Sequence, residues 1–125
     1  MTAKQQSLPS SELTELIVEG IKDKKGLKII SMHLGLIKNA ICEQFVICHG
    51  TSRTQVEAIA ENVKEHVKKH LGVRPWRSEG YENAEWILID YFDVVVHIFQ
   101  QQTREHYKLE ELWADAELKE YDAVD

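Results

Sequence analysis

Residues 85–100, with the sequence EWILIDYFDVVVHIFQ, place two aspartates and a histidine among aliphatic and aromatic residues. Carboxylate and imidazole groups serve as metal ligands and as general acids and bases. Asp90, Asp93 and His97 would do such chemistry only if the fold held them within a few ångströms of one another. The other interpretations are recognition of a partner and a structural role. In the structural role the aspartates accept hydrogen bonds from turn amides and the histidine packs under a helix.

The spacing of these residues disfavours a shared metal ion. The tightest hairpin turn has Tyr91 and Phe92 as its two loop residues, so that Asp90 pairs with Asp93. His97 then lies four residues along the strand from Asp93, roughly 13 Å away. One face of this hairpin is aliphatic and belongs to the core. The other is mixed, and carries Trp86, Leu88, Asp90, Asp93, Val95 and His97.

The mixed face also has the composition of a recognition surface. Trp86, Tyr91 and Phe92 are residue types that contribute much of the binding energy at protein interfaces. Asp90 and Asp93 beside them would select a basic partner. These residues alone support the structural role and recognition equally.

Residues 48–53, CHGTSR, connect a predicted strand to a predicted helix, where backbone amides can bind phosphate. The segment has one glycine and lacks the lysine of a phosphate-binding loop. We therefore expect Gly50 to make a tight turn and Ser52 to cap the helix. Because no nucleophile-elbow motif is present either, we expect no enzyme and no cofactor.

The remaining metal and thiol candidates are weak. His66 and His70 are four residues apart on one predicted helix, but they lie among lysines and are expected to be solvated. Cys42 and Cys48 are too far apart along an extended segment to form a disulfide. We expect both cysteines to be small buried residues in a reducing compartment.

Length and charge set the class of protein. The chain has 125 residues, 43% of them hydrophobic and 29% charged, which indicates one globular domain. Its net charge is −6, so we expect no DNA partner and no general RNA binding. The absence of a signal peptide and of a membrane-length apolar run predicts a cytoplasmic protein without a membrane partner.

Hydrophobic periodicity predicts an α/β domain with a mixed sheet of about five strands flanked by helices. Residues 1–9 are expected to be disordered, residues 10–118 to form the domain, and residues 119–125 to be an acidic tail. Gly26 and Gly72 are expected to end the first two helices. The expected elements are a helix from residue 10 or 11 to about 26, strands 27–34 and 43–49, a helix 52–72, a short edge strand within 74–80, the hairpin, and a helix 103–118.

Three ordered blocks carry a resemblance to a known family. They are FVICHGTSRTQVEAIAENV, EGYENAEWILIDYFDVVVHIF and REHYKLEELW, and they resemble the ribosomal silencing factors, the Iojap-like family. The resemblance implies a fold similar to nucleotidyltransferases but without their catalytic carboxylates. It also implies binding to the large ribosomal subunit through large-subunit ribosomal protein fourteen, which obstructs joining of the small subunit when nutrients are scarce.

The resemblance implies a partner-binding site as well, at Trp86, Asp90, Asp93 and Glu79. Tyr91 and Phe92 join this site from the pairing argument alone. The family also implies that the chain can form a homodimer. No small-molecule substrate is expected.

The chain departs from the family pattern at several positions. Glu43 stands where the family has aspartate, and Lys28 and the pair Met32–His33 stand near positions where it also has aspartate. Phe92 replaces a common glycine, so the two-residue turn is the part of the prediction most open to change.

Two alternative functions stay open at this point. One is a nucleotidyltransferase-like enzyme that binds a nucleotide near residues 50–52. The other is an oligomeric scaffold that self-associates through the hairpin.

Overall fold

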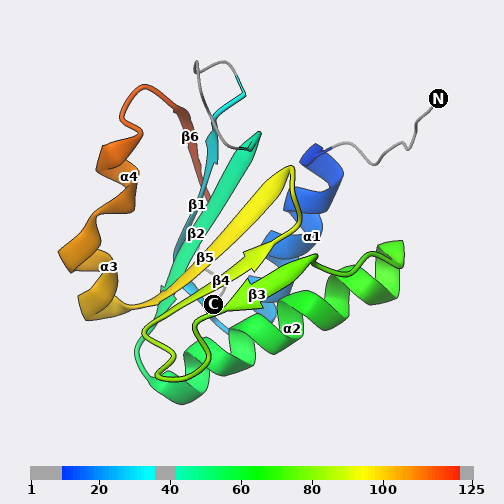
Figure 1. Cartoon of the computed structure of the whole chain (residues 1–125), viewed down its shortest axis with the longest axis horizontal. Helices are drawn as coiled ribbons and strands as arrows, with labels where there is room; N and C mark the ends of the chain where they lie inside the picture. Colours follow the sequence, from blue (N-terminus) through cyan, green and yellow to red (C-terminus); the bar gives the residue numbers. More distant parts are fainter. Residues whose placement is uncertain (1–9, 36–41, 122–125) are drawn as a thin grey trace.

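The computed structural model describes residues 10–35 and 42–121, which form one mixed sheet with helices on its faces (Figure 1). The sheet has six strands in the order β3-β4-β5-β2-β1-β6. Residues 1–9, residues 36–41 between the first two strands, and residues 122–125 of the expected acidic tail lie outside the described residues. The elements are α1 (Ser10–Asp23), β1 (Leu27–His33), β2 (Gln44–Gly50), α2 (Arg53–Leu71), β3 (Arg77–Glu79), β4 (Trp86–Asp90), β5 (Val94–Gln100), α3 (Gln101–Tyr107), α4 (Leu109–Leu112) and β6 (Glu117–Glu120).

The centre of the sheet is a parallel pair, β2 beside β5. On one side β4 and then β3 are added antiparallel, and on the other side β1 and then β6 are added antiparallel. This arrangement confirms the predicted α/β class with a mixed sheet, and it confirms that residues 77–79 form an edge strand.

The two faces of the sheet are covered differently. Helices α1 and α2 lie together across one face, where they bury a large cluster that includes Ile17, Ile59, Val63, Val96 and Ile98. The opposite face carries a second, smaller cluster around Met32, Phe45 and Phe99, which α3 and α4 cover only in part (Figure 1). Among the described residues no helix is long and apolar enough to cross a bilayer.

Helix α2 has the caps that the sequence predicts. The Ser52 hydroxyl accepts a 3.0 Å hydrogen bond from the Gln55 amide, and Gly72 ends the helix in the left-handed region. The side chain of Gln55 does not complete a reciprocal capping box, because its oxygen accepts from the Thr51 amide at 2.8 Å. Its nitrogen donates to the Lys24 and Lys25 carbonyls, which ties the end of α1 to the start of α2.

The end of α1 differs from the prediction. The residue with positive φ is Lys25, not Gly26. Glycine is needed at position 26 because the backbone there lies close to the Ile21 side chain, with which a Cβ would overlap.

The predicted single helix 103–118 is wrong. Lys108 adopts a left-handed conformation with φ of 49°, so α3 ends at Tyr107 and a separate turn, α4, follows. Residues 117–120 then pair with β1 and make the sixth strand, which includes residues 119 and 120 of the expected acidic tail.

The buried residue Arg104 holds this C-terminal unit on the sheet. Its guanidinium donates to the Lys28 carbonyl at 2.9 Å and to His49 Nδ1 at 3.0 Å, and it pairs with Glu110 at 2.9 Å. A buried arginine needs such partners, because an unpaired buried charge is strongly destabilising.

The loop before β4 depends on one glycine. Gly80 has φ of 98°, and a Cβ there would overlap with the Trp86 carbonyl oxygen, whereas Gly72 has φ of 68° with open space around it. We predict that Gly80→Ala lowers the free energy of unfolding by about 3 kcal/mol, because it adds a steric clash to a backbone strain. Gly72→Ala, with strain alone, should cost about 1 kcal/mol. Urea denaturation of the two variants measures the difference, and equal losses would contradict the close approach.

Candidate partner-docking surface

The β4–β5 hairpin has a longer turn than the sequence argument assumed. Asp90 lies opposite Val95 and Leu88 opposite His97, and residues 91–93 lie between the end of β4 and the start of β5. The predicted pairing of Asp90 with Asp93 is therefore wrong. Because the shift is two residues, every strand side chain keeps the face that was predicted for it.

The turn is built around Phe92 in an uncommon conformation. The Asp93 amide donates to the Tyr91 carbonyl at 3.0 Å, and Phe92 between them has φ of 72°. This is a γ-turn of the rarer kind, which is strained for a residue with a side chain. Such a conformation costs roughly 1–3 kcal/mol, and the Phe92 ring is 65% exposed.

Asp90 organises the residues around the turn. Its carboxylate accepts from the Phe92 amide at 2.8 Å and from Arg77 Nε at 3.3 Å, while its carbonyl accepts from the Trp76 amide at 3.0 Å. Arg77 also pairs with Glu79 at 2.6 Å. The side chain of Asp90 is only 13% exposed, so it fits the structural role proposed for the aspartates.

Asp93 sits differently. Asp93 is exposed overall. Partial burial of its carboxyl and the nearby negative charge of Glu43 raise the pKa of that carboxyl above the ordinary value. The Glu43 and Gln44 amides both donate to the Asp93 carbonyl, which holds the two acids at the same end of the sheet. A cation placed between them would relieve their repulsion.

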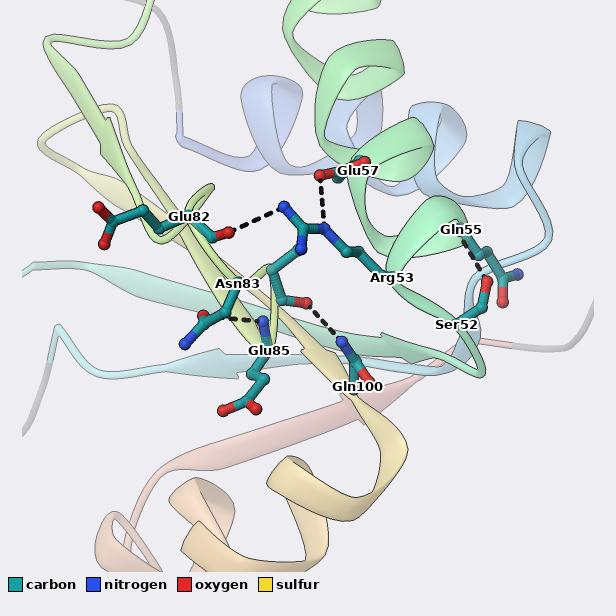
Figure 2. A network of polar contacts seen from close by, with 9 residues as sticks. Ser52, Arg53, Gln55, Glu57, Glu82, Asn83, Glu85 and Gln100 are labelled. Carbon is teal, nitrogen blue, oxygen red and sulfur yellow. Dashed lines mark hydrogen bonds and ion pairs between the residues drawn. The ribbon is translucent and has the colours of Figure 1, made fainter.

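Trp86 lies half-buried at the start of β4. Its indole N–H donates to His97 Nδ1 at 3.1 Å, and its ring contacts those of Phe99 at 4.8 Å and Tyr107 at 5.0 Å. The loop leading into Trp86 is fixed as well. Arg53 donates to the Glu82 carbonyl and Gln100 donates to the Ala84 carbonyl (Figure 2).

His97 is a core residue, not a ligand. It is 4% exposed, and burial lowers its pKa from 6.5 to about 4, with the negative charge of Asp90 acting in the opposite direction. Its Nε2 atom has no hydrogen-bond partner. Within residues 10–35 and 42–121, no group of three or more side chains is arranged to hold a metal ion.

Tyr91 is also in the core. It is 7% exposed and packs in the cluster beneath α1 and α2, because it continues the alternation of Ile87 and Ile89 and its amide donates to the Val94 carbonyl. Burial raises the pKa of its hydroxyl. The structure therefore separates Tyr91 from the other predicted site residues.

The remaining predicted residues share one open surface with residues that the sequence argument left out. The register of β3 on β4 sets Arg77 opposite Asp90 and Glu79 opposite Leu88, on the sheet face away from α1 and α2. Helix α3 packs against β5 and β2 and reaches β4 through the contact of Tyr107 with Trp86, so β3 and the rest of β4 are left open on this side. We define the docking surface as Trp76, Arg77, Glu79, Trp86, Leu88, Asp90, Phe92, Asp93 and Tyr107.

Sequence reasoning missed Trp76, Arg77 and Tyr107 on this surface. Trp76 and Tyr107 are 56% and 52% exposed, which only the structure reveals. Trp76 fell within the expected short strand and Tyr107 within the expected helix 103–118, so neither was considered for the surface.

The turn at residues 50–52 is filled by the chain itself. The side-chain oxygen of Gln55 accepts a hydrogen bond from the Thr51 amide. The same oxygen lies 3.0 Å from the position that a Cβ on Gly50 would have. The Ser52 hydroxyl accepts a hydrogen bond from the Gln55 amide, as a helix N-cap does. Two amides that a phosphate would use are therefore already bonded.

The weaker candidates also have structural environments. His66 is not solvated as expected, since its Nε2 lies 2.9 Å from Glu19 on α1 and its side chain is 18% exposed. Cys42 and Cys48 are free, and burial raises their thiol pKa values to about 11 and 12. Neither thiol is activated as a nucleophile, because the thiolate is the reactive form.

The buried His97 predicts an acid-dependent stability. In the unfolded chain it binds a proton below about pH 6.5, but in the folded protein only near pH 4, so stability should fall as the pH drops through this window. We expect a loss of up to about 3 kcal/mol in the free energy of unfolding. His97→Gln should flatten this part of the profile in urea denaturation, whereas the exposed His33→Gln should not. Parallel profiles for all three proteins would contradict the assignment.

Comparisons with known proteins give a family match, similar sequences and a similar solved structure. The family described as ribosomal silencing factor during starvation matches residues 7–125. The ribosomal silencing factor RsfS of Halalkalibacterium halodurans is 42% identical over 117 residues, which cover 94% of this chain and 98% of that protein. A crystal structure of a Chromobacterium violaceum protein superposes with a TM-score of 0.81 at 34% identity, covering 86% of this chain and 88% of the other.

A more distant relative covers part of the chain. The mouse protein named mitochondrial assembly of ribosomal large subunit protein 1 is 35% identical over 74 residues, 57% of this chain and 32% of that protein. The family match over nearly the full length, the similarity to the bacterial relative and the shared fold lead to one conclusion. This chain belongs to the ribosomal silencing factor family.

Proposed function

We propose that this protein is a translation inhibitor that binds the large ribosomal subunit through large-subunit ribosomal protein fourteen and sterically blocks joining of the small subunit. The observation that carries the proposal is the open sheet face over β3 and β4, which combines exposed aromatic rings with acidic side chains. Family membership supports the silencing role, and the name of the mouse relative supports the large subunit as the target.

The charge of the docking surface favours a protein contact on the ribosome. Its one cation, Arg77, is already paired with Glu79 and Asp90. The exposed acid Asp93 adds negative charge at the turn, with Glu43 beside it. Because RNA phosphates would be repelled by these acids, a basic ribosomal protein is the partner that the surface fits.

Each residue of the surface would have its own role. The exposed Asp93 would pair with Lys or Arg of the partner, and the exposed Glu79, which pairs with Arg77, would add negative charge. Asp90 positions the turn and Arg77. Trp86 supplies a half-buried aromatic platform, which His97 and Tyr107 hold in place.

Inhibition by this route requires no bond-making. The protein would occupy space that the small subunit needs, so the affinity for the large subunit sets the degree of inhibition.

Charge reversal tests the exposed acids of the surface. Glu79→Lys and Asp93→Lys should each weaken binding to isolated large subunits by about tenfold at low salt, because a favourable contact with a basic partner becomes repulsive. Glu65→Lys makes the same change in net charge on the exposed side of α2, against the other face of the sheet, and should bind like the wild type. Co-sedimentation with separated large and small subunits measures binding, and the yield of joined ribosomes measures inhibition.

Two outcomes would contradict parts of this proposal. Binding of the wild type to neither subunit would reject the ribosomal function. Equal losses for Glu79→Lys and Glu65→Lys would show a general charge effect instead of a docking site. A saturable rise in melting temperature with nucleotide and Mg²⁺ would favour the nucleotidyltransferase-like alternative.

A further inference from the structure

The docking surface ends in an exposed pair of stacked aromatic rings. The Trp76 and Phe92 rings lie 5.2 Å apart with 11° between their planes. The two residues are 56% and 65% exposed. They come from the start of β3 and from the β4–β5 turn, and they meet only because β3 pairs with β4.

Asp90 and Arg77 hold the Trp76–Phe92 pair in place. Asp90 accepts from the Phe92 amide with its carboxylate and from the Trp76 amide with its carbonyl. The guanidinium carbon of Arg77 lies 5.3 Å from the centre of the Trp76 ring. Since both backbones are fixed before any partner arrives, little conformational entropy remains to be lost on binding.

Folding alone gives no reason for Phe92 at this place. Its backbone is in the strained γ-turn conformation, which glycine would adopt without strain. Its ring contributes nothing to either core cluster. Strain kept at an exposed aromatic residue points to a contact outside the chain.

We propose that the Trp76–Phe92 pair is a second anchor of the docking surface, which packs against a nonpolar or cationic side chain on a basic protein surface of the large subunit. This inference rests on the proposed function. Asp90 bonds to the Phe92 amide and to Arg77, and Arg77 pairs with Glu79. One partner would therefore cover both the aromatic pair and these charged residues.

The surrounding charges select this occupant over two others. If a second copy of this chain bound through the same surface, Asp93 and Glu79 of one copy would face the same acids of the other copy, and these like charges would repel. RNA bases stack on aromatic rings, but their phosphates would meet the same acids. A lysine or arginine of the partner gains both an ion pair with these acids and the face of an aromatic ring.

The decisive variant is Phe92→Gly, because it separates binding from folding. Removing the ring should relieve the strained turn, so the midpoint of urea unfolding should stay the same or rise. Binding to the large subunit should nevertheless weaken by about tenfold, the size expected for an interface anchor. Trp76→Ala should weaken binding similarly. Leu112→Ala serves as the control, since Leu112 is 72% exposed on α4 and lies outside the docking surface.

Each outcome is informative. If Phe92→Gly and Trp76→Ala bind like the wild type while Asp93→Lys does not, the second anchor is wrong and the proposed function stands. If the wild type binds neither subunit, the proposed function itself fails. If the two aromatic variants instead lose self-association in sedimentation velocity, or binding to naked ribosomal RNA, the occupant is a second copy or RNA and the proposal is overturned.

Discussion

The parallel pairing of β2 with β5 is the constraint on which the rest of the structure depends. Parallel neighbours cannot be joined by a tight turn, so the chain must cross over between them, and this connection contains α2, β3 and β4. Nearly every residue of both strands is buried, which is possible only if each sheet face is covered. All other strands are added to this pair as antiparallel neighbours.

The two faces satisfy this requirement unequally. Helices α1 and α2 cover one face broadly, whereas on the other face the short α3, which the buried Arg104 ties to α4, packs against β5 and β2. The strands β3 and β4 are left with one side open to solvent. A short, charged edge strand such as β3 is a common protection against unwanted sheet pairing. Here the same open side carries the exposed aromatic rings and acids of the docking surface.

Asp90 shows how a structural role and recognition can coexist. From the sequence the two roles are alternatives for the same acid. In the structure Asp90 is nearly buried and accepts turn hydrogen bonds, and by doing so it presents Phe92, Trp76 and Arg77. The acids Asp93 and Glu79 are exposed, and Glu79 also pairs with Arg77. A fixed arrangement of this kind lowers the entropy lost on association.

The sequence by itself determined the features that depend on neighbours a few residues away. The Ser52 cap, the Gly72 terminus and the alternation of faces along the hairpin are of this kind, and they agree with the structure. The tertiary structure decided what depends on distant pairing. The burial of Tyr91, the register of the hairpin, the β6 strand and the meeting of Trp76 with Phe92 all follow from which strand lies beside which. A local pattern fixes the face on which a side chain points, but ladder hydrogen bonds and core packing fix what that side chain meets.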